Sequence, residues 1–242
     1  MSPPGSADVP VGTGSGRAAD EDVCASRGWY SRGYLPHRDH AHLIQSITFR
    51  LADGLPQETL KRITEELLDR EESQREIERR KRIEQWLDTG MGCCALGHPE
   101  VARYVQDAFL HFHGQRYHLH AWCIMPNHVH LLIEPLIDIA TIVQGWKSFT
   151  ARWVLKRNDE LALKIPSSDQ LWLREYWDRY IRDPEHYRKA VDYIHQNPVK
   201  AGLCQTAADW PWSSAAPGSA DVLVGIAPAQ ADGDVGAPST HP

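Results

Sequence analysis

The chain contains 242 residues, of which 42% are hydrophobic and 24% are charged, and its formal net charge is −6. This length allows one sizeable hydrophobic core with appendages, because domains cluster near ~100–150 residues. Residues 1–27 and 204–242 carry the whole of the net charge, so the stretch between them is neutral. The charge balance therefore neither indicates nor excludes a nucleic-acid partner, since a local basic stripe is sufficient to bind one.

Membrane and disulfide-rich classes are not expected. No apolar run approaches the ~20 residues needed to cross a bilayer, and the N-terminus lacks the basic-then-apolar order of a signal peptide. The five cysteines are odd in number, and Cys93 and Cys94 are adjacent, which is unlike a disulfide framework. We therefore expect a soluble, cytoplasmic protein with no membrane partner.

Both ends of the chain are predicted to be disordered tails, at 1–27 and 215–242. They are rich in Gly, Pro, Ala, Ser and Asp and almost free of aromatic residues, so they bury too little apolar surface to fold. The segment PGSADVPVG at 4–12 recurs as PGSADVLVG at 217–225. Two copies are too few for a repeat architecture, which needs at least about three stacked units.

The first half of the chain predicts one strand and two helices. Apolar and β-branched residues in 42–54, followed by Asp53-Gly54, predict a strand and a turn. Residues 56–88 have helical spacing of leucine and isoleucine, begin at Pro56 and run until Gly90. Acidic residues interleave with the basic cluster 79–82 of this stretch, so we interpret the cluster as a salt-bridged solvent face. A second helix is predicted at 99–113.

The second half adds three strands and two helices. Residues 116–134 alternate with period 2 and are interrupted by Pro126-Asn127, which predicts two strands. A helix is predicted at 137–157, a short strand at 171–177, and a helix at 184–196 that begins after Asp183 and is stopped by Pro198. The order β-α-β-β-α-β plus a final helix predicts an α+β, ferredoxin-like fold: one antiparallel sheet, helices on one face, and a C-terminal tyrosine-bearing helix.

Two histidines on a predicted strand are the first candidate site. In His128-Val129-His130 the two imidazoles point to the same face, where both can reach one ion, and Val129 faces the core. Solvated or hydrogen-bonded histidines are the alternative, because the chain has 13 of them.

The final predicted helix carries the second candidate. Tyr193 and Asn197 are four residues apart, so they share one helix face. A tyrosine hydroxyl titrates near ~10 and needs activation, but it can act as a nucleophile and form a covalent phosphotyrosine ester. The alternative is that Tyr193 is a core aromatic, and that Asn197 ends the helix as a C-cap.

Three motifs in order carry a resemblance to a known family. They are HAWCIMPNHVHLLIEP, REYWDRYIRDPEHYRKAVDYIHQNPVKAGL and WPWSS at 210–214, and together they cover about 100 residues. From residue 117 onward the chain resembles the single-tyrosine HUH transposases, and in particular the REP-associated tyrosine transposases (RAYT). The resemblance implies a transposase domain over 28–214, with 56–88 as a helical insertion.

The resemblance also implies roles for the candidate residues. His128 and His130 would be metal ligands, Tyr193 the nucleophile, and Asn197 the third, amide-type ligand. The ion would be Mg²⁺ or Mn²⁺, although the Irving–Williams order lets Zn²⁺ compete. Tyr193 would attack a phosphorus atom and form a 5′-phosphotyrosine link with release of a 3′-hydroxyl, in transposition or in processing of repeated palindromic elements.

The implied partner is single-stranded or hairpin DNA, bound by a monomer or a homodimer. Residues 145–200 hold eleven basic against eight acidic residues, with four tryptophans among them, and cations and exposed indoles suit phosphates and bases. We expect Lys147, Arg152, Arg174 and Arg179 to bind DNA, and most of the tryptophans to lie in the core.

Two other functions remain open from the sequence. One is a catalytically inactive, domesticated DNA-binding protein that keeps the fold. The other is a zinc-stabilised protein using ligands among Cys93, Cys94, His98, His118, His120 and Cys123. The sequence lacks the paired CxxC spacing of structural zinc sites, which counts against the second.

Overall fold

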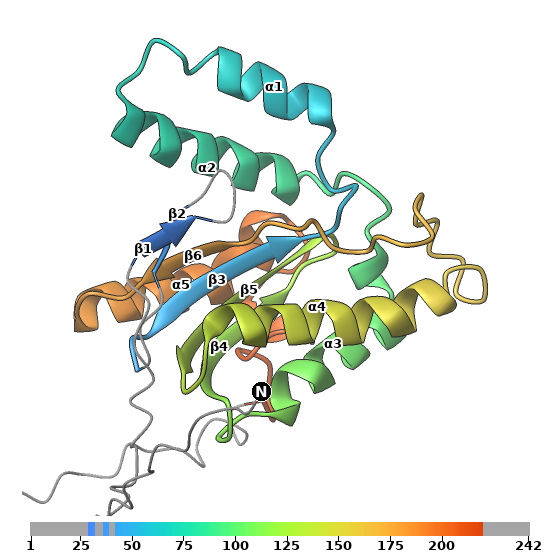
Figure 1. Ribbon diagram of the computed structural model, residues 1–242. Coiled ribbons are helices and arrows are strands. Elements are labelled where there is room, and N and C mark those ends of the chain that lie inside the picture. The colour runs from blue at the N-terminus through green and yellow to red at the C-terminus, as the bar shows by residue number, and fades with distance from the viewer. Residues whose placement is uncertain (1–28, 32–35, 39–41, 220–242) are drawn as a thin grey trace, which may run out of the picture.

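The computed structural model describes residues 29–31, 36–38 and 42–219 (Figure 1). Its strands are β1 Trp29–Ser31, β2 Pro36–Arg38, β3 Gln45–Arg50, β4 Tyr117–Ile124, β5 His128–Pro135 and β6 Trp177–Tyr180. Its α-helices are α1 Gln57–Glu65, α2 Glu72–Asp88, α3 Pro99–His111, α4 Ile139–Lys156 and α5 Pro184–Lys200. The predicted tails lie outside the described residues, except for 215–219.

The main sheet is four-stranded and antiparallel, in the order β4-β5-β3-β6. The first strand of the predicted motif, β3, therefore lies next to the last, β6, and the central hairpin β4–β5 completes the sheet. This is the strand order of a ferredoxin-like fold. The α+β fold class predicted from the sequence is confirmed. The short strands β1 and β2 form a separate antiparallel pair.

Helices cover both faces of the sheet, with α3 and α4 on one and α5 on the other (Figure 1). The larger core lies under α3 and α4, where Phe49, Trp122 and Val129 from the sheet meet Phe109 and Trp146 from the helices. A smaller core under α5 joins Cys123 and Leu132 of the sheet to Ile194. The sheet face that points at α5 is the face that carries both histidines of β5.

A β-bulge corrects the strict alternation expected for 116–124. The register of β4 against β5 shifts between Leu119 and Ala121, so His120 is the extra residue. Tyr117 and Leu119 therefore face the larger core with Trp122, whereas Ala121 and Cys123 face α5. A bulge inserts one residue and reverses the faces that follow it, which a period-2 pattern does not reveal.

The single helix expected over 56–88 is wrong. The chain breaks after Glu65 and folds back, so α1 and α2 form a helical hairpin above the sheet (Figure 1). Folding back buries Ile63 and Leu67 of the first arm against Ile83 and Leu87 of the second, which one straight helix would leave in solvent. Arg75 stabilises the bend by donating hydrogen bonds to three carbonyl oxygens of the turn between α1 and α2, those of Leu67, Leu68 and Arg70.

Two further boundaries differ from those predicted. The last strand covers Trp177–Tyr180 rather than 171–177, and Trp172 is buried in the larger core instead, in an isolated bridge to Leu51. The final helix continues through Pro198 to Lys200. Proline removes one backbone donor from a helix, and the side-chain amide of Asn197 donates to the carbonyl of Tyr193 within this turn.

The WPWSS segment lies along β4, at the edge of the sheet. Backbone bonds join Ile124 N–H to the Trp212 carbonyl and Ser214 N–H to the Trp122 carbonyl. The hydroxyl of Ser214 also lies 2.8 Å from Nε2 of His195 on α5, so the segment connects this helix to the sheet. None of the helices in the described part of the chain has the length and apolarity to span a membrane.

Candidate active site

The two histidines of β5 converge on one point. Their Nε2 atoms are 3.0 Å apart, and both side chains are about 1% exposed. The rings stand perpendicular, with centroids 4.7 Å apart. Val129 between them is buried in the opposite core, as its position in the strand predicts.

Asn127 determines which nitrogen of His128 carries the proton. The Nδ2 group of Asn127 donates to the carbonyl oxygens of Leu87 and Met91, each at 3.0 Å, which identifies it as the nitrogen of the amide. The other atom, Oδ1, lies 2.7 Å from Nδ1 of His128. Because an amide oxygen only accepts, His128 must carry hydrogen on Nδ1 and present a bare lone pair at Nε2.

Thr48 gives His130 two possible tautomers. Its hydroxyl lies 2.9 Å from Nδ1 of His130 and can either donate or accept. With hydrogen on Nε2, His130 donates to His128. With hydrogen on Nδ1, it donates to Thr48, and two lone pairs then face each other, an arrangement that a cation between them stabilises.

The electrostatics keep both imidazoles neutral. Burial, with a smaller contribution from Arg50, lowers the pKa of His128 to about 3. Burial also lowers the pKa of His130 well below its usual value, helped by His128, Arg80 and Lys200. A neutral imidazole is the ligand form of histidine.

The spacing of the pair suits a metal ion. Two adjacent ligands at right angles, each about 2.1 Å from an ion, lie about 3.0 Å from each other. The Nε2 separation is 3.0 Å, and both Nδ1 atoms already have partners, as is usual for ligating histidines. Within the described residues no three His, Cys, Asp or Glu side chains form a metal-binding group, so an ion bound here would take its further ligands from other residue types, substrate or water.

The structure brings Tyr193 to the histidine pair. Its ring packs edge-on against His130, with centroids 5.4 Å apart, and Nζ of Lys200 lies 4.8 Å from its centroid. Burial raises the pKa of Tyr193 well above its ordinary value, and the nearby carboxylates of Glu84 and Asp88 contribute in the same direction. The phenol is therefore protonated at neutral pH and needs a proton acceptor before it can react.

Asn197 lies one turn beyond Tyr193 on α5 and is 1% exposed. It is an interior residue of the helix, so the alternative of a C-cap is wrong. Its Nδ2 group donates to the Tyr193 carbonyl at 2.8 Å, which leaves Oδ1 as the atom of this side chain suited to bind a cation.

Helix α2 supplies acidic residues that the sequence did not indicate as part of the site. Oδ1 of Asp88 lies 4.0 Å from Nε2 of His128, and burial together with Glu84 raises the pKa of Asp88 to about 6. Glu84, one turn earlier, pairs with Arg80 at 3.1 Å. Both carboxylates belong to a stretch of interleaved charges, and the only available signal was their i, i+4 spacing at the end of that helix.

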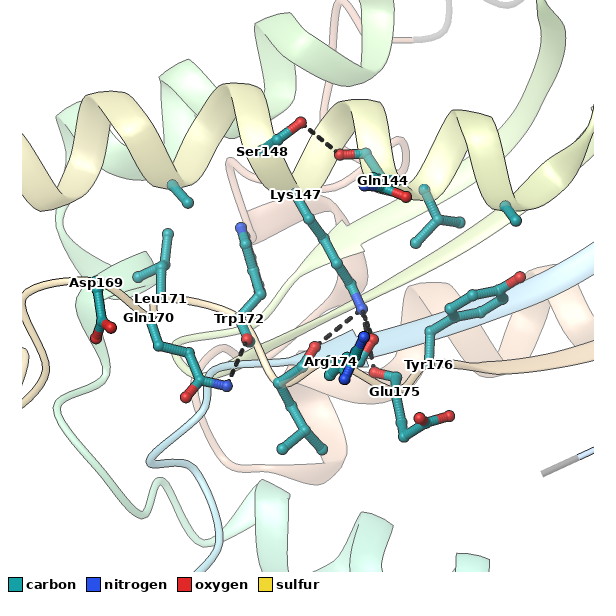
Figure 2. A pocket seen from close by; sticks show the side chains of 14 residues that line it. Gln144, Lys147, Ser148, Asp169, Gln170, Leu171, Trp172, Arg174, Glu175 and Tyr176 are labelled. Atoms are coloured by element: carbon teal, nitrogen blue, oxygen red, sulfur yellow. Dashed lines mark hydrogen bonds between the residues drawn. The ribbon is translucent and has the colours of Figure 1, made fainter. Parts of the chain in front are cut away.

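Lys147 lies away from the histidine pair, in a pocket of roughly 600 Å³ between α4 and residues 169–176 (Figure 2). Its Nζ atom donates to the carbonyl oxygens of Leu173, Arg174 and Glu175 at 3.0–3.1 Å. Burial lowers its pKa to about 7. Only the ammonium form of Lys147 has three hydrogens to donate. Protonated Lys147 therefore fixes the segment that carries Arg174.

The other predicted DNA-binding residues are on the surface. Arg152, Arg174 and Arg179 are exposed, on α4, on the segment before β6 and on β6 respectively. The candidate zinc ligands do not gather into a metal-binding group within the described residues. Instead, Cys93 lies against Asp53, while Cys123 is in the core under α5.

Comparison with known proteins gives a family for this site. Residues 99–197 match the model of the family described as "Transposase IS200 like", and this range includes both histidines, Tyr193 and Asn197. The REP-associated tyrosine transposase of Escherichia coli (strain K12) is 32% identical over 120 residues, covering 49% of this chain and 65% of the relative. A putative REP-associated tyrosine transposase of Haemophilus influenzae is 34% identical over 99 residues, covering 39% of this chain and 56% of the relative.

The chain thus spans less than two thirds of the length of each of these curated relatives. A solved structure of a REP-associated tyrosine transposase bound to a REP hairpin aligns with a TM-score of 0.43 and 20% identity, over 87% of this chain and 94% of that one. The matched family model and the two curated relatives confirm the resemblance that the three sequence motifs indicate. Residues 99–197 of this chain are thus similar to the IS200-like transposase family, and the chain is similar to the REP-associated tyrosine transposases.

Proposed function

We propose that this protein is a metal-dependent, single-stranded DNA endonuclease and strand transferase that acts beside hairpins through a covalent 5′-phosphotyrosine intermediate. The observation that carries the proposal is the meeting of three groups: two imidazoles whose Nε2 atoms are 3.0 Å apart, and the Tyr193 ring, whose centroid lies 5.4 Å from that of the His130 ring. The substrate class follows the names of the curated relatives, and REP-type palindromes are the first DNA to test.

His128, His130 and Oδ1 of Asn197 are the residues that would hold a divalent ion, Mg²⁺ or Mn²⁺. Such an ion, when bound, polarises the scissile phosphate and stabilises the negative charge that develops on it. The contribution of the protein is to keep both imidazoles neutral and aimed at one point, through Asn127 and Thr48.

Tyr193 forms the covalent link. Its Oη attacks the phosphorus, the bond from phosphorus to the 3′ oxygen breaks, and the leaving strand takes a proton to become a 3′-hydroxyl. Glu84 is the candidate acceptor of the phenolic proton, because it acts on Tyr193 strongly enough to raise the pKa of the phenol. The tyrosyl ester retains the energy of the broken bond, so a second 3′-hydroxyl can reverse the step.

The transposase domain would extend over 28–214, with the α1–α2 hairpin as its insertion. Arg152, Arg174 and Arg179 would contact DNA phosphates from the surface. Lys147 would act through the backbone of residues 173–175, whose carbonyl oxygens it binds. Monomer and homodimer are both compatible with this arrangement.

The decisive experiment tests the nucleophile. Labelled single-stranded hairpins from the genomic flanks of the gene are incubated with the protein and Mn²⁺, and a covalent adduct is sought on denaturing gels. Tyr193→Phe removes only the hydroxyl, so DNA binding should survive while cleavage and the adduct vanish. Tyr187→Phe is the matched control, because its hydroxyl lies 3.2 Å from His120 rather than at the histidine pair.

An adduct that persists in Tyr193→Phe would overturn the assignment of the nucleophile. Tight hairpin binding with no adduct in the parent protein would favour the catalytically inactive DNA-binding alternative instead.

A further inference from the structure

Two arginines at the edge of the histidine site have no anionic partner among the residues that the structure describes. Arg50 ends β3 and is 6% exposed, and its Nη1 atom is buried without a hydrogen-bond partner. Arg79 on α2 is half-buried, and its Nε atom is likewise buried and unpartnered. Among the described residues neither guanidinium forms an ion pair, and Arg50 has only the ring of Trp177, 6.0 Å away.

The position of Arg50 connects this pair to the site. Arg50 lies directly opposite His128 in the β3–β5 ladder, two residues along from the Thr48–His130 pair. Residues i and i+2 of a strand share a face, so Arg50 lies on the same face as Thr48, beside the two imidazoles. Its charge is one cause of the low pKa of His128.

Bringing these two arginines together is unfavourable in the protein alone. Burial and, to a smaller extent, the positive charge of Arg79 together lower the pKa of Arg50 to about 10. No carboxylate contributes in the opposite direction. Buried charges are normally paired, and each unpaired buried donor carries a desolvation cost, so the arrangement favours binding of an anion that the described residues do not supply.

Two neighbouring arginines of α2, unlike Arg79, have acidic partners. Arg80 pairs with Glu84, and Arg82 pairs with Glu66 and Glu78. The sequence pattern had assigned the whole cluster 79–82 to a salt-bridged surface, and this holds for Arg80 and Arg82.

We propose that Arg50 and Arg79 form a phosphate-binding pair that holds a phosphodiester of the DNA strand against the histidine pair. The guanidinium group presents planar donors that match phosphate oxygens, and such charge-assisted bonds are among the strongest in proteins. The proposal rests on the proposed function, because it names residues that position the strand for Tyr193. Both are positioning residues, since they bind the substrate backbone and leave the reacting bond to Tyr193.

The test compares Arg50→Gln and Arg79→Gln with Arg82→Gln, which removes the same charge from an arginine that already has partners. Binding of a labelled hairpin with a single-stranded flank is measured by fluorescence anisotropy in EDTA, over a range of salt concentrations. Each phosphate contact on a single strand contributes about 0.7 to the slope of log K against log salt concentration. Arg50→Gln and Arg79→Gln should each lower this slope by about 0.7 and weaken binding on the order of tenfold. Arg82→Gln should match the parent protein.

Thermal unfolding separates this role from a structural one. Removing a buried, unpaired charge should leave the melting temperature of both variants unchanged or higher, whereas a structural arginine would lower it. Sodium phosphate should also raise the melting temperature of the parent more than sodium chloride of equal ionic strength, and this difference should disappear in both variants.

The proposal would be overturned if Arg50→Gln and Arg79→Gln had the same salt slope as Arg82→Gln and were stabilised by phosphate to the same extent. If Arg50→Gln fails to fold, Arg79→Gln tests the same pair from the more accessible helix. The phosphate measurement needs neither cleavage nor a known DNA target. Suppose that the parent protein forms no covalent adduct, but phosphate still raises its melting temperature and does so only when both arginines are present. That result would contradict the proposed function and still support the phosphate-binding pair.

Discussion

At the scale of single residues, Asn127 joins the histidine site to the helical hairpin. Asn127→Ala should remove the acceptor that fixes the tautomer of His128 and leave the carbonyls of Leu87 and Met91 without their donor. We expect Mn²⁺ affinity to fall about 10–100-fold and the free energy of unfolding to fall by about 1–3 kcal/mol. Isothermal titration with Mn²⁺ and urea unfolding measure the two effects.

Asn127→Asp separates these effects. It keeps an acceptor for His128 but places negative charge against two carbonyl oxygens, so stability should fall while more of the metal affinity survives. Equal Mn²⁺ affinity in the parent and Asn127→Ala would contradict the role of Asn127 in orienting the ligand.

The two histidines of β5 should each be essential for cleavage. His128→Ala or His130→Ala removes one of two converging nitrogens, so cleavage in Mg²⁺ or Mn²⁺ should be abolished, and EDTA should do the same to the parent. Cleavage of labelled hairpin DNA measures this. Undiminished cleavage in EDTA would exclude a metal role.

Asn197→Ala should weaken metal dependence without removing the nucleophile. If Oδ1 is a ligand, activity should recover partly as Mn²⁺ is raised, because lost affinity is offset by mass action. Cleavage is measured against Mn²⁺ concentration, alongside the melting temperature. A lower melting temperature with an unshifted Mn²⁺ curve would reduce Asn197 to its hydrogen bond with the Tyr193 carbonyl.

At the scale of elements, the α1–α2 hairpin depends on a small core of its own. Ile83 is 1% exposed within it, whereas Ile77, on the same helix, is 71% exposed. Ile83→Ala should cost about 2–4 kcal/mol of unfolding free energy, and Ile77→Ala should change it by less than about 0.5 kcal/mol. Urea unfolding of the two variants checks this. Equal effects would mean that the hairpin does not unfold together with the rest of the domain.

The predictable elements are those whose signals are local. Asp183 and Pro184 begin α5 where expected, and Pro126-Asn127 separates β4 from β5. The bend between α1 and α2 contains no proline or glycine that would predict it. It is stabilised instead by Arg75 and by contacts between the two helices. The extension of α5 through Pro198 could not be predicted either. The rule that proline ends a helix considers one residue and ignores the packing that stabilises the helix.

The candidate site also combines residues that a local motif predicts with residues that only tertiary contacts bring there. The motif placed His128, His130 and Tyr193, which the structure brings together. Asp88, Glu84 and Arg79 come from a helix far away in sequence, and their charges were indistinguishable from those of an ordinary solvent face. Only the tertiary fold shows that Arg79 has no acidic partner in the described part of the chain, while Arg82 has two.

At the scale of the whole molecule, buried neutral histidines should make the fold acid-sensitive. The unfolded chain takes up a proton on His128 below about pH 6.5, whereas the folded chain does so only near pH 3. The free energy of unfolding therefore falls as pH drops through this window, by up to about 1.4 kcal/mol per pH unit for each such histidine. Asp88, with its pKa raised to about 6, acts with the opposite sign between pH 6 and 4.

Because several other histidines also have lowered pKa values, their effect should outweigh that of Asp88. Urea unfolding at pH 7 and pH 5 tests this, with a lower stability expected at pH 5. The drop should be smaller in His128→Asn, which cannot take up the proton. A stability that rises from pH 7 to pH 5 would show that Asp88 dominates.

The hydrogen bonds from Asn127 to the carbonyls of Leu87 and Met91 imply that ion binding at the histidines and docking of the α1–α2 hairpin are thermodynamically coupled. When the end of α2 lifts away, Asn127 loses both acceptors and no longer holds His128 in its ligating tautomer. Linkage is reciprocal, so an ion that prefers the docked state must make lifting rarer by the same factor. Hydrogen exchange at the amides of Thr89 and Gly90, which close the last turn of α2, should therefore slow when Mn²⁺ binds some distance away in the sheet.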